Sequence, residues 1–248
     1  MNTLINDKYE KSIYSHYCSV DLLRGISAII ILVFHYQHFF INYSNFNHQF
    51  NSSSLPFYSI IYLIYEHGQY AVRLFWLISG FVFSFVYYKR FSTTKSFIVS
   101  RIARLYPLHF ITLVIVLLLQ YYSYFINEYY QIYQDNSLKN FLLNIFFIYG
   151  WGFETGQGFN NPIWSVSIEI IAYALFWIFI GIMFRYGFII PLIIIFTSIF
   201  LIYLKIDYTN IILDCVFYFF LGVCCYIFVH KKINYYLKIL IFLIFFMF

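Results

Sequence analysis

Two basic side chains interrupt a long apolar run, and their types and spacing suit proton transfer inside a membrane. Residues 20–40 read VDLLRGISAIIILVFHYQHFF, with Arg24 near the start and His35 in the second half. Eleven residues turn an α-helix to within about 20° of three full turns, so both side chains are predicted to share one face, about 16 Å apart. A neutral imidazole could take the proton of a hydroxyl. His38, three residues further on, is predicted to shape the outer mouth of a cavity on that face.

A second polar stripe lies in residues 162–173, PIWSVSIEIIAY. Ser165, Glu169 and Tyr173 recur at every fourth position and therefore share one face of a helix, where they are predicted to line a cavity. A carboxylate within an apolar span needs a cation or a polar cavity, so Arg73 or His35 is its expected partner. Glu169 would then orient His35 as the general base. The alternative for Ser165 is a hydrogen bond to a backbone carbonyl.

Three further arginines stand at the ends of apolar runs. Arg73 lies one turn into YAVRLFWLISGF and is predicted to line the cavity. Arg101 and Arg104, in FIVSRIARLYPL, lie three residues apart and so on one helix face. Guanidinium groups bind phosphates through planar pairs of donors, although this pair could instead only anchor a helix at the membrane surface. Phosphate-binding cations on one side and a base half a membrane away suit a long donor molecule.

The elements that must position these residues are membrane-spanning helices. The 248 residues are 62% hydrophobic and only 10% charged, whereas soluble domains are about a quarter charged. The net charge of +5 collects at the ends of apolar runs, which argues against nucleic-acid binding. The predicted fold is an all-α polytopic bundle of about seven spans, with residues 1–19 as an N-terminal segment and residues 20–248 as the transmembrane domain. The predicted spans are residues 20–40, 70–88, about 107–125, 163–184, 188–204, 211–229 and 233–248.

The direction of the later spans depends on residues 140–150, an apolar stretch too short to cross a bilayer alone. If it crossed, Arg185 and the lysines near residue 235 would lie outside. A re-entrant or interfacial segment is preferred, because it keeps these cations inside. Residues 89–104 contain five cations and no acid, so they are predicted to be cytoplasmic. The chain is thus expected in the cytoplasmic membrane with its N-terminus inside.

The blocks quoted above occur in the order typical of the integral-membrane acyltransferase type 3 family, whose members O-acetylate cell-surface sugars, and the chain resembles that family over residues 19–184. The resemblance implies acetyl-CoA as a donor entering from the cytoplasm, a carbohydrate acceptor on the far side, no permanently bound cofactor and no metal. Arg24 and His35 match the family's essential pair. Arg101 and Arg104 match its paired-arginine motif, and Glu169 matches the acid of the Trp-Ser block.

Several readings remain beside this one. His35 either acts as a base or briefly carries the acyl group. The same polar groups would also suit a transporter or flippase for a polar or sugar-lipid substrate. Family members usually have about ten spans, and this chain ends inside an apolar run. A truncated acyltransferase without activity is therefore a further expectation.

Overall fold

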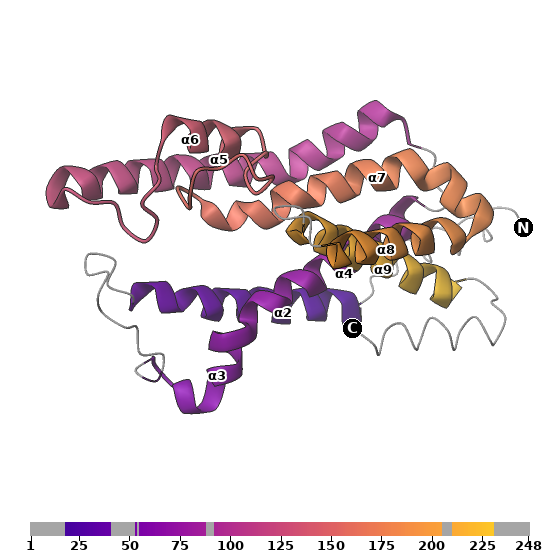
Figure 1. Ribbon diagram of the computed structural model, residues 1–248, viewed down its shortest axis with the longest axis horizontal. Helices are drawn as coiled ribbons and strands as arrows, with labels where there is room; N and C mark the ends of the chain where they lie inside the picture. Colours follow the sequence, from indigo (N-terminus) through magenta and orange to yellow (C-terminus); the bar gives the residue numbers. More distant parts are fainter. Residues whose placement is uncertain (1–17, 41–52, 54, 88–91, 205–209, 231–248) are drawn as a thin grey trace, which may run out of the picture.

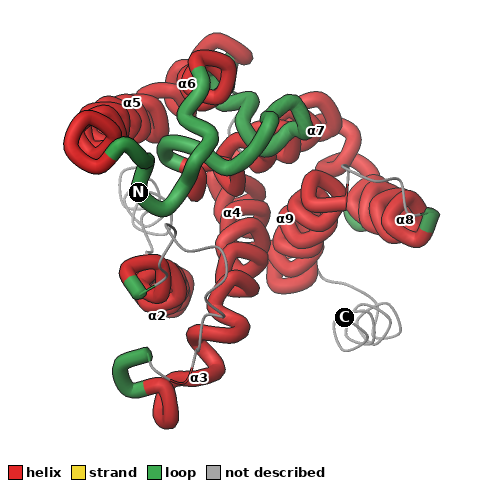
Figure 2. The backbone as a smooth tube through the Cα atoms, turned by 60° about the vertical axis from the view of Figure 1, so that its left-hand side comes forward, coloured by secondary structure: helices red, strands yellow, loops and turns green. Residues whose placement is uncertain are grey.

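The computed structural model describes residues 18–40, 53, 55–87, 92–204 and 210–230. Over these residues the chain forms helices and no strands, which confirms the predicted all-α fold (Figures 1 and 2). The helices are α2 (Cys18–Tyr36), α3 (Tyr58–His67), α4 (Ala71–Tyr87), α5 (Thr94–Asn127), α6 (Leu138–Ile145), α7 (Trp164–Tyr186), α8 (Ile189–Tyr203) and α9 (Asn210–His230).

Six of the predicted spans are helical. Within the described residues, five stretches are long and apolar enough to cross a membrane, and α8 is a shorter apolar helix. The chain is therefore a multi-pass membrane protein. The helix of the third span begins earlier than predicted, because Thr93 accepts a hydrogen bond from the Ser96 backbone and caps α5 within the basic stretch. The predicted span 233–248 lies outside the described residues, as do most of the N-terminal segment 1–19 and of the loop 42–56.

The tightest helix contact joins α4 and α9, which lie side by side at the centre of the molecule (Figure 2). A Cβ atom added at Gly80 would meet the backbone carbonyl of Phe219, and one added at Gly222 would meet that of Leu77. Small residues let helix backbones approach closely in membranes, where dispersion contacts replace hydrophobic burial. α8 packs on the other side of α9, and α2 packs against α4.

The contacts of α4 and α9 also give the topology of the chain. Arg73 meets Asp214 near the start of both helices, and Phe85 meets Tyr226 near their ends, so the two helices run parallel. Besides the short helix α6, three longer helices, α5, α7 and α8, lie between them in the chain. An extra crossing at residues 140–150 would make α9 run opposite to α4. With α5, α7 and α8 each crossing once, the parallel arrangement agrees with the prediction that this stretch does not span.

Residues 135–159 instead form a re-entrant segment that returns to the side where it began. Its descending part is α6, capped by the Ser137 side chain. The tip reaches the middle of α5, where His109 Nε2 lies 2.9 Å from the Asn144 carbonyl oxygen. The two ends lie together, since the Asn140 side-chain amide donates to the carbonyls of Asp135 and Gly156. Buried amides thus satisfy backbone groups that lipid could not.

Candidate active site

A polar cavity of about 180 Å³ lies between α2, α4, α5 and α7. It is bounded by residues from each of these helices: Arg24, Phe75, Ser79, Val82, Phe83, Arg101, Arg104, Leu105, Glu169 and Tyr173. Three guanidinium groups and one carboxyl group line it, so basic side chains outnumber acidic ones. The structure therefore brings together Arg24, Arg101, Arg104, Glu169 and Tyr173, five of the residues predicted from the sequence.

Glu169 is the acidic residue of this cavity. Its carboxylate forms side-chain hydrogen bonds with Ser79 and Tyr173 and interacts electrostatically with Arg104 and Arg24. A spanning carboxylate needs such partners, because an isolated charge in hydrocarbon is costly. Glu169 reaches these groups because α7 holds it one turn from Tyr173, on the face toward α4.

Arg101 is held in place by aromatic rings. Its guanidinium lies 4.7 Å from the centroid of the Phe83 ring and donates to the Tyr87 hydroxyl at 3.3 Å. Phe83 in turn stacks on Tyr173 at a centroid distance of 4.3 Å. Stacking on a ring leaves the edge of a guanidinium free to donate hydrogen bonds. The cavity thus holds Arg101 in a fixed orientation suited to an anion.

Arg73 does not join this cavity, and the predicted pairing of Arg73 with Glu169 is wrong. Arg73 Nε instead donates to Asp214 Oδ2 at 2.7 Å, and its guanidinium lies over the rings of Tyr70 and Tyr218. The reason is the parallel packing of α4 on α9, which places Asp214 beside Arg73. Glu169, on α7, instead contacts Ser79, which lies further along α4. Arg73 is therefore a link between two helices.

Ser165 also has a different role from the one predicted. Its hydroxyl donates to the Pro162 carbonyl at 3.1 Å, and its own carbonyl accepts from Trp76 Nε1. Ser165 is not among the residues that line the cavity. The alternative of a hydroxyl bonded to backbone is therefore the correct one for this residue, which lies where α7 begins.

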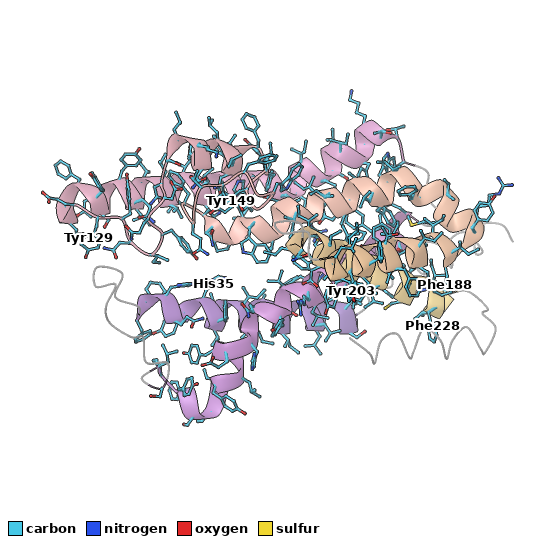
Figure 3. All side chains as sticks on the ribbon, viewed as in Figure 1. His35, Tyr129, Tyr149, Phe188, Tyr203 and Phe228 are labelled. Carbon is cyan, nitrogen blue, oxygen red and sulfur yellow. The ribbon has the colours of Figure 1, made fainter. Side chains whose placement is uncertain are left out.

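Arg24 and His35 share one face of α2, as predicted. Ser27, on one flank of that face, is fully buried, whereas Leu32, on its other flank, is 73% exposed. His35 is half-buried, and its side chain projects toward the side on which α5 and α7 lie (Figure 3). It lies three turns from Arg24, about 16 Å along the helix, so the structure does not bring it to Glu169. The expected contact between these two residues is not formed.

His35 and His38 form an aromatic pair at the far end of α2. Their rings stack at a centroid distance of 5.5 Å, and the ring of Tyr133 meets His38 edge-on at 5.8 Å. Tyr133 also forms a side-chain hydrogen bond with Asn161. Neither histidine lines the arginine cavity. The two groups of predicted site residues therefore lie at opposite ends of α2.

The loop that supplies Tyr133 is held together by polar contacts. The Tyr149 hydroxyl donates to Asn161 Oδ1 at 2.7 Å, and its burial raises the pKa of the phenol to about 12. The Thr155 hydroxyl donates to Asp135, which lowers the pKa of that carboxyl below its usual range. The loop is therefore an ordered scaffold for Tyr133 and for the start of α7.

Sequence reasoning missed Ser79 and Tyr133, and it expected Asp214 as a structural group without naming its partner. Ser79 bonds to Glu169, and the signal for it was a hydroxyl in the middle of an apolar span. Asp214 pairs with Arg73, and it is the acid of an otherwise apolar helix. Such an acid usually marks a buried partner. Tyr133 had no distinguishing signal, because aromatic residues are frequent throughout this chain.

Comparison with known proteins gives one match. The model of a family described as an acyltransferase domain matches residues 18–248, nearly the whole chain. No curated protein and no solved structure matches. The matched range contains both the arginine cavity and the histidine pair.

Proposed function

Since the chain belongs to the acyltransferase type 3 family, we propose that it is a membrane O-acyltransferase that moves an acetyl group from acetyl-CoA to a hydroxyl of a cell-surface carbohydrate. The observation that supports this most is the cavity in which Arg24, Arg101 and Arg104 converge. Coenzyme A is a long molecule with phosphates at one end and the thioester at the other. A cluster of arginines at one end of α2 and an imidazole at the other suits that shape.

The arginine cavity is proposed to hold the phosphates of the donor. At about 180 Å³ it is smaller than the roughly 300–1,000 Å³ of pockets that enclose a drug-sized ligand, so it would take only part of the donor. Charge-assisted hydrogen bonds from arginine to phosphate are stronger than neutral ones. Glu169, which touches Ser79 and Tyr173, keeps the three cations from repelling one another without cancelling their charge.

His35 is proposed as the general base. Its imidazole takes the proton of the acceptor hydroxyl while the oxygen attacks the thioester carbonyl. The carbon–sulfur bond then breaks, and the leaving thiolate takes the proton back from the imidazolium. Each proton and electron pair is accounted for without another reactant. We propose that the donor enters from the cytoplasmic side, where the basic stretch at residues 89–104 lies, and that the acceptor binds on the far side of the cytoplasmic membrane.

Replacement of His35 tests this proposal. His35→Ala should lower transfer from acetyl-CoA to surface polysaccharide by about 10²- to 10⁴-fold, the usual contribution of a general base. Transfer is measured with radiolabelled acetyl-CoA and purified protein in nanodiscs, and binding of the donor is measured separately by calorimetry. Donor binding should persist, because His35 lies about 16 Å from the arginines.

Leu32→Ala is the matched control, since Leu32 lies one turn away on α2 and is 73% exposed. It should transfer acetyl groups like the unmodified protein. Full transfer by His35→Ala would remove His35 from the mechanism. Absence of acetyl-CoA binding by the unmodified protein would contradict the proposed donor.

A further inference from the structure

A second and larger cavity opens on the outside of the bundle, between α5 and α7. It measures about 550 Å³ and is closed at one end by Phe147, near the tip of the re-entrant segment. Among the described residues that line it, Arg101 is the charged one. Its rim is open, since Ile98 is 48%, Ile102 55% and Ile178 67% exposed. In a spanning bundle exposed apolar residues face hydrocarbon, so over the part of the chain that the structure describes this groove is open toward the bilayer.

The length of the groove matches one leaflet. Along α5 its lining runs from Thr94 to Tyr106, thirteen residues that cover about 18 Å of helix. The hydrocarbon core of a bilayer is about 30 Å thick, so one leaflet contributes roughly half of that. A groove of this length that begins at the membrane surface ends near the bilayer midplane. A hydrocarbon chain standing in one leaflet would lie along it.

The surface end of the groove has groups that suit a lipid headgroup. Trp177 Nε1 donates to the Thr94 hydroxyl at 3.2 Å and links the two helices there. Tryptophan is typical of the interface between hydrocarbon and water. Lys95, next to Thr94, is exposed. A cation at this depth attracts the phosphate of an anionic lipid.

We propose that this groove binds one acyl chain of an anionic membrane phospholipid, with the headgroup at Lys95. The site goes beyond acyl transfer and does not depend on it. A membrane lipid enters sideways through the open rim. A chain attached to coenzyme A would instead have to pass Arg101, Leu105 and Tyr173, which form the wall shared with the arginine cavity. The bound chain packs against this wall and supports it from the lipid side.

Labelling with a photoreactive lipid tests the site. The full chain is purified in nanodiscs that contain phosphatidylglycerol with a diazirine in its acyl chain. Ile102→Trp, from α5, and Ala174→Trp, from α7, each place an indole in the groove. Both variants should lower labelling of peptides from α5 and α7 by about tenfold, because an indole occupies the space of the chain.

The matched control is Leu118→Trp, since Leu118 is also on α5, is 64% exposed and lies outside the groove. It should be labelled like the unmodified protein. Equal labelling of the control and both groove variants would overturn the site. Competition with unlabelled palmitoyl-CoA tests whether the groove binds the acyl chain of a coenzyme A thioester instead of that of a membrane lipid. Displacement by palmitoyl-CoA but not by unlabelled phosphatidylglycerol would assign the groove to an acyl donor and overturn the lipid proposal.

The headgroup is tested with the same probe chain on phosphatidylcholine. Phosphatidylglycerol should label the protein about fivefold more strongly, the effect expected of one cation near the surface, and Lys95→Gln should remove that preference. Equal labelling by both lipids would contradict the anionic headgroup. Each of these readouts is independent of acetyl transfer, so failure here and failure of the proposed function are separate results.

Discussion

The role of each arginine in this protein depends on the residues that helix packing places beside it. Arg73 is the third residue of α4, whereas Arg104 is the eleventh residue of α5. Arg73 is paired with Asp214 at 2.7 Å and contacts two tyrosine rings. Arg104 lines the polar cavity with two further arginines and with Glu169. The first is thus neutralised by the fold, whereas the second remains available to an anionic ligand.

Substitution by alanine should separate these two roles. Arg104→Ala should weaken acetyl-CoA binding by about tenfold or more, the loss of a charge-assisted hydrogen bond. Arg73→Ala should leave donor affinity within about twofold, because it lies outside the cavity. Calorimetry with the purified protein measures both. A strong loss of donor affinity in Arg73→Ala would contradict its assignment as a link between helices.

Arg73→Ala should instead lower the unfolding temperature, since it leaves Asp214 without its cation. Adding Asp214→Asn to that variant should restore part of the loss, because no unpaired carboxylate then remains. Thermal unfolding followed by fluorescence measures this. If the decrease in unfolding temperature of the double variant equals the sum of the decreases in the two single variants, Arg73 and Asp214 do not stabilise each other.

At the scale of elements, two glycines set how close the central helices can come. Gly80 and Gly222 each present a bare backbone to the other helix, so α4 and α9 touch through main-chain atoms. This contact fixes the position of α4 along α9 and places Arg73 opposite Asp214. On its other side α4 supplies Ser79 and Phe83 to the arginine cavity. The packing of α4 on α9 therefore positions the site indirectly.

Single methyl groups should reveal this packing. Gly80→Ala or Gly222→Ala should destabilise the protein by about 1–3 kcal/mol, because the facing backbone has no room for the Cβ atom. Gly181→Ala on α7 is the matched control, since its Cβ atom meets nothing within 4 Å. It should stabilise by about 0.5–1 kcal/mol through helix propensity. Chemical unfolding in detergent measures the change in the free energy of unfolding, which should be negative for Gly80→Ala and Gly222→Ala and positive for Gly181→Ala. A change of the same sign in all three variants would refute the close contact.

At the scale of the molecule, α2 connects the two ends of the proposed reaction path. It packs mainly on α4 and α3, and Figure 2 shows it set apart from α5 and α7. At one end Arg24 faces Arg104 and Glu169 across the cavity. At the other end His38 meets Tyr133 of the loop before α6. These two contacts hold the face of α2 that contains His35 toward the rest of the bundle.

Loss of the outer contact should affect transfer but not donor binding. Tyr133→Ala removes the ring that meets His38 and should lower kcat by about tenfold, since small misplacement of a base is costly. The dissociation constant of acetyl-CoA should stay within about twofold, because the arginine cavity is far away. Tyr129→Ala is the matched control, as Tyr129 lies in the same loop and is 39% exposed. Equal losses in both variants would indicate a general loop defect.

Much of the architecture could be predicted from local patterns. Runs of about 20 apolar residues predict spans, and a fourfold spacing predicts that Glu169 and Tyr173 share a face. Cation counts predicted that residues 140–150 do not cross, and the parallel packing of α4 and α9 agrees. These features depend on residues that are close together in the chain, so they can be predicted from the sequence alone.

The partners of the charges could not be predicted in this way. Asp214 lies 141 positions from Arg73, and nothing in either apolar helix indicates that they meet. Glu169 was expected near Arg73 or His35, but helix packing placed it with Ser79, Tyr173 and the paired arginines instead.

The sequence by itself determined that this chain is a helical membrane protein of the acyltransferase type 3 family with Arg24 and His35 on one face of a helix. Both properties follow from hydropathy, helical periodicity and motif order along the chain. Only the tertiary structure decided that the arginines converge on Glu169 while His35 lies with His38 and Tyr133. Contacts between spanning helices depend on shape and on close approach at small residues, and no local pattern encodes which pair of helices will meet.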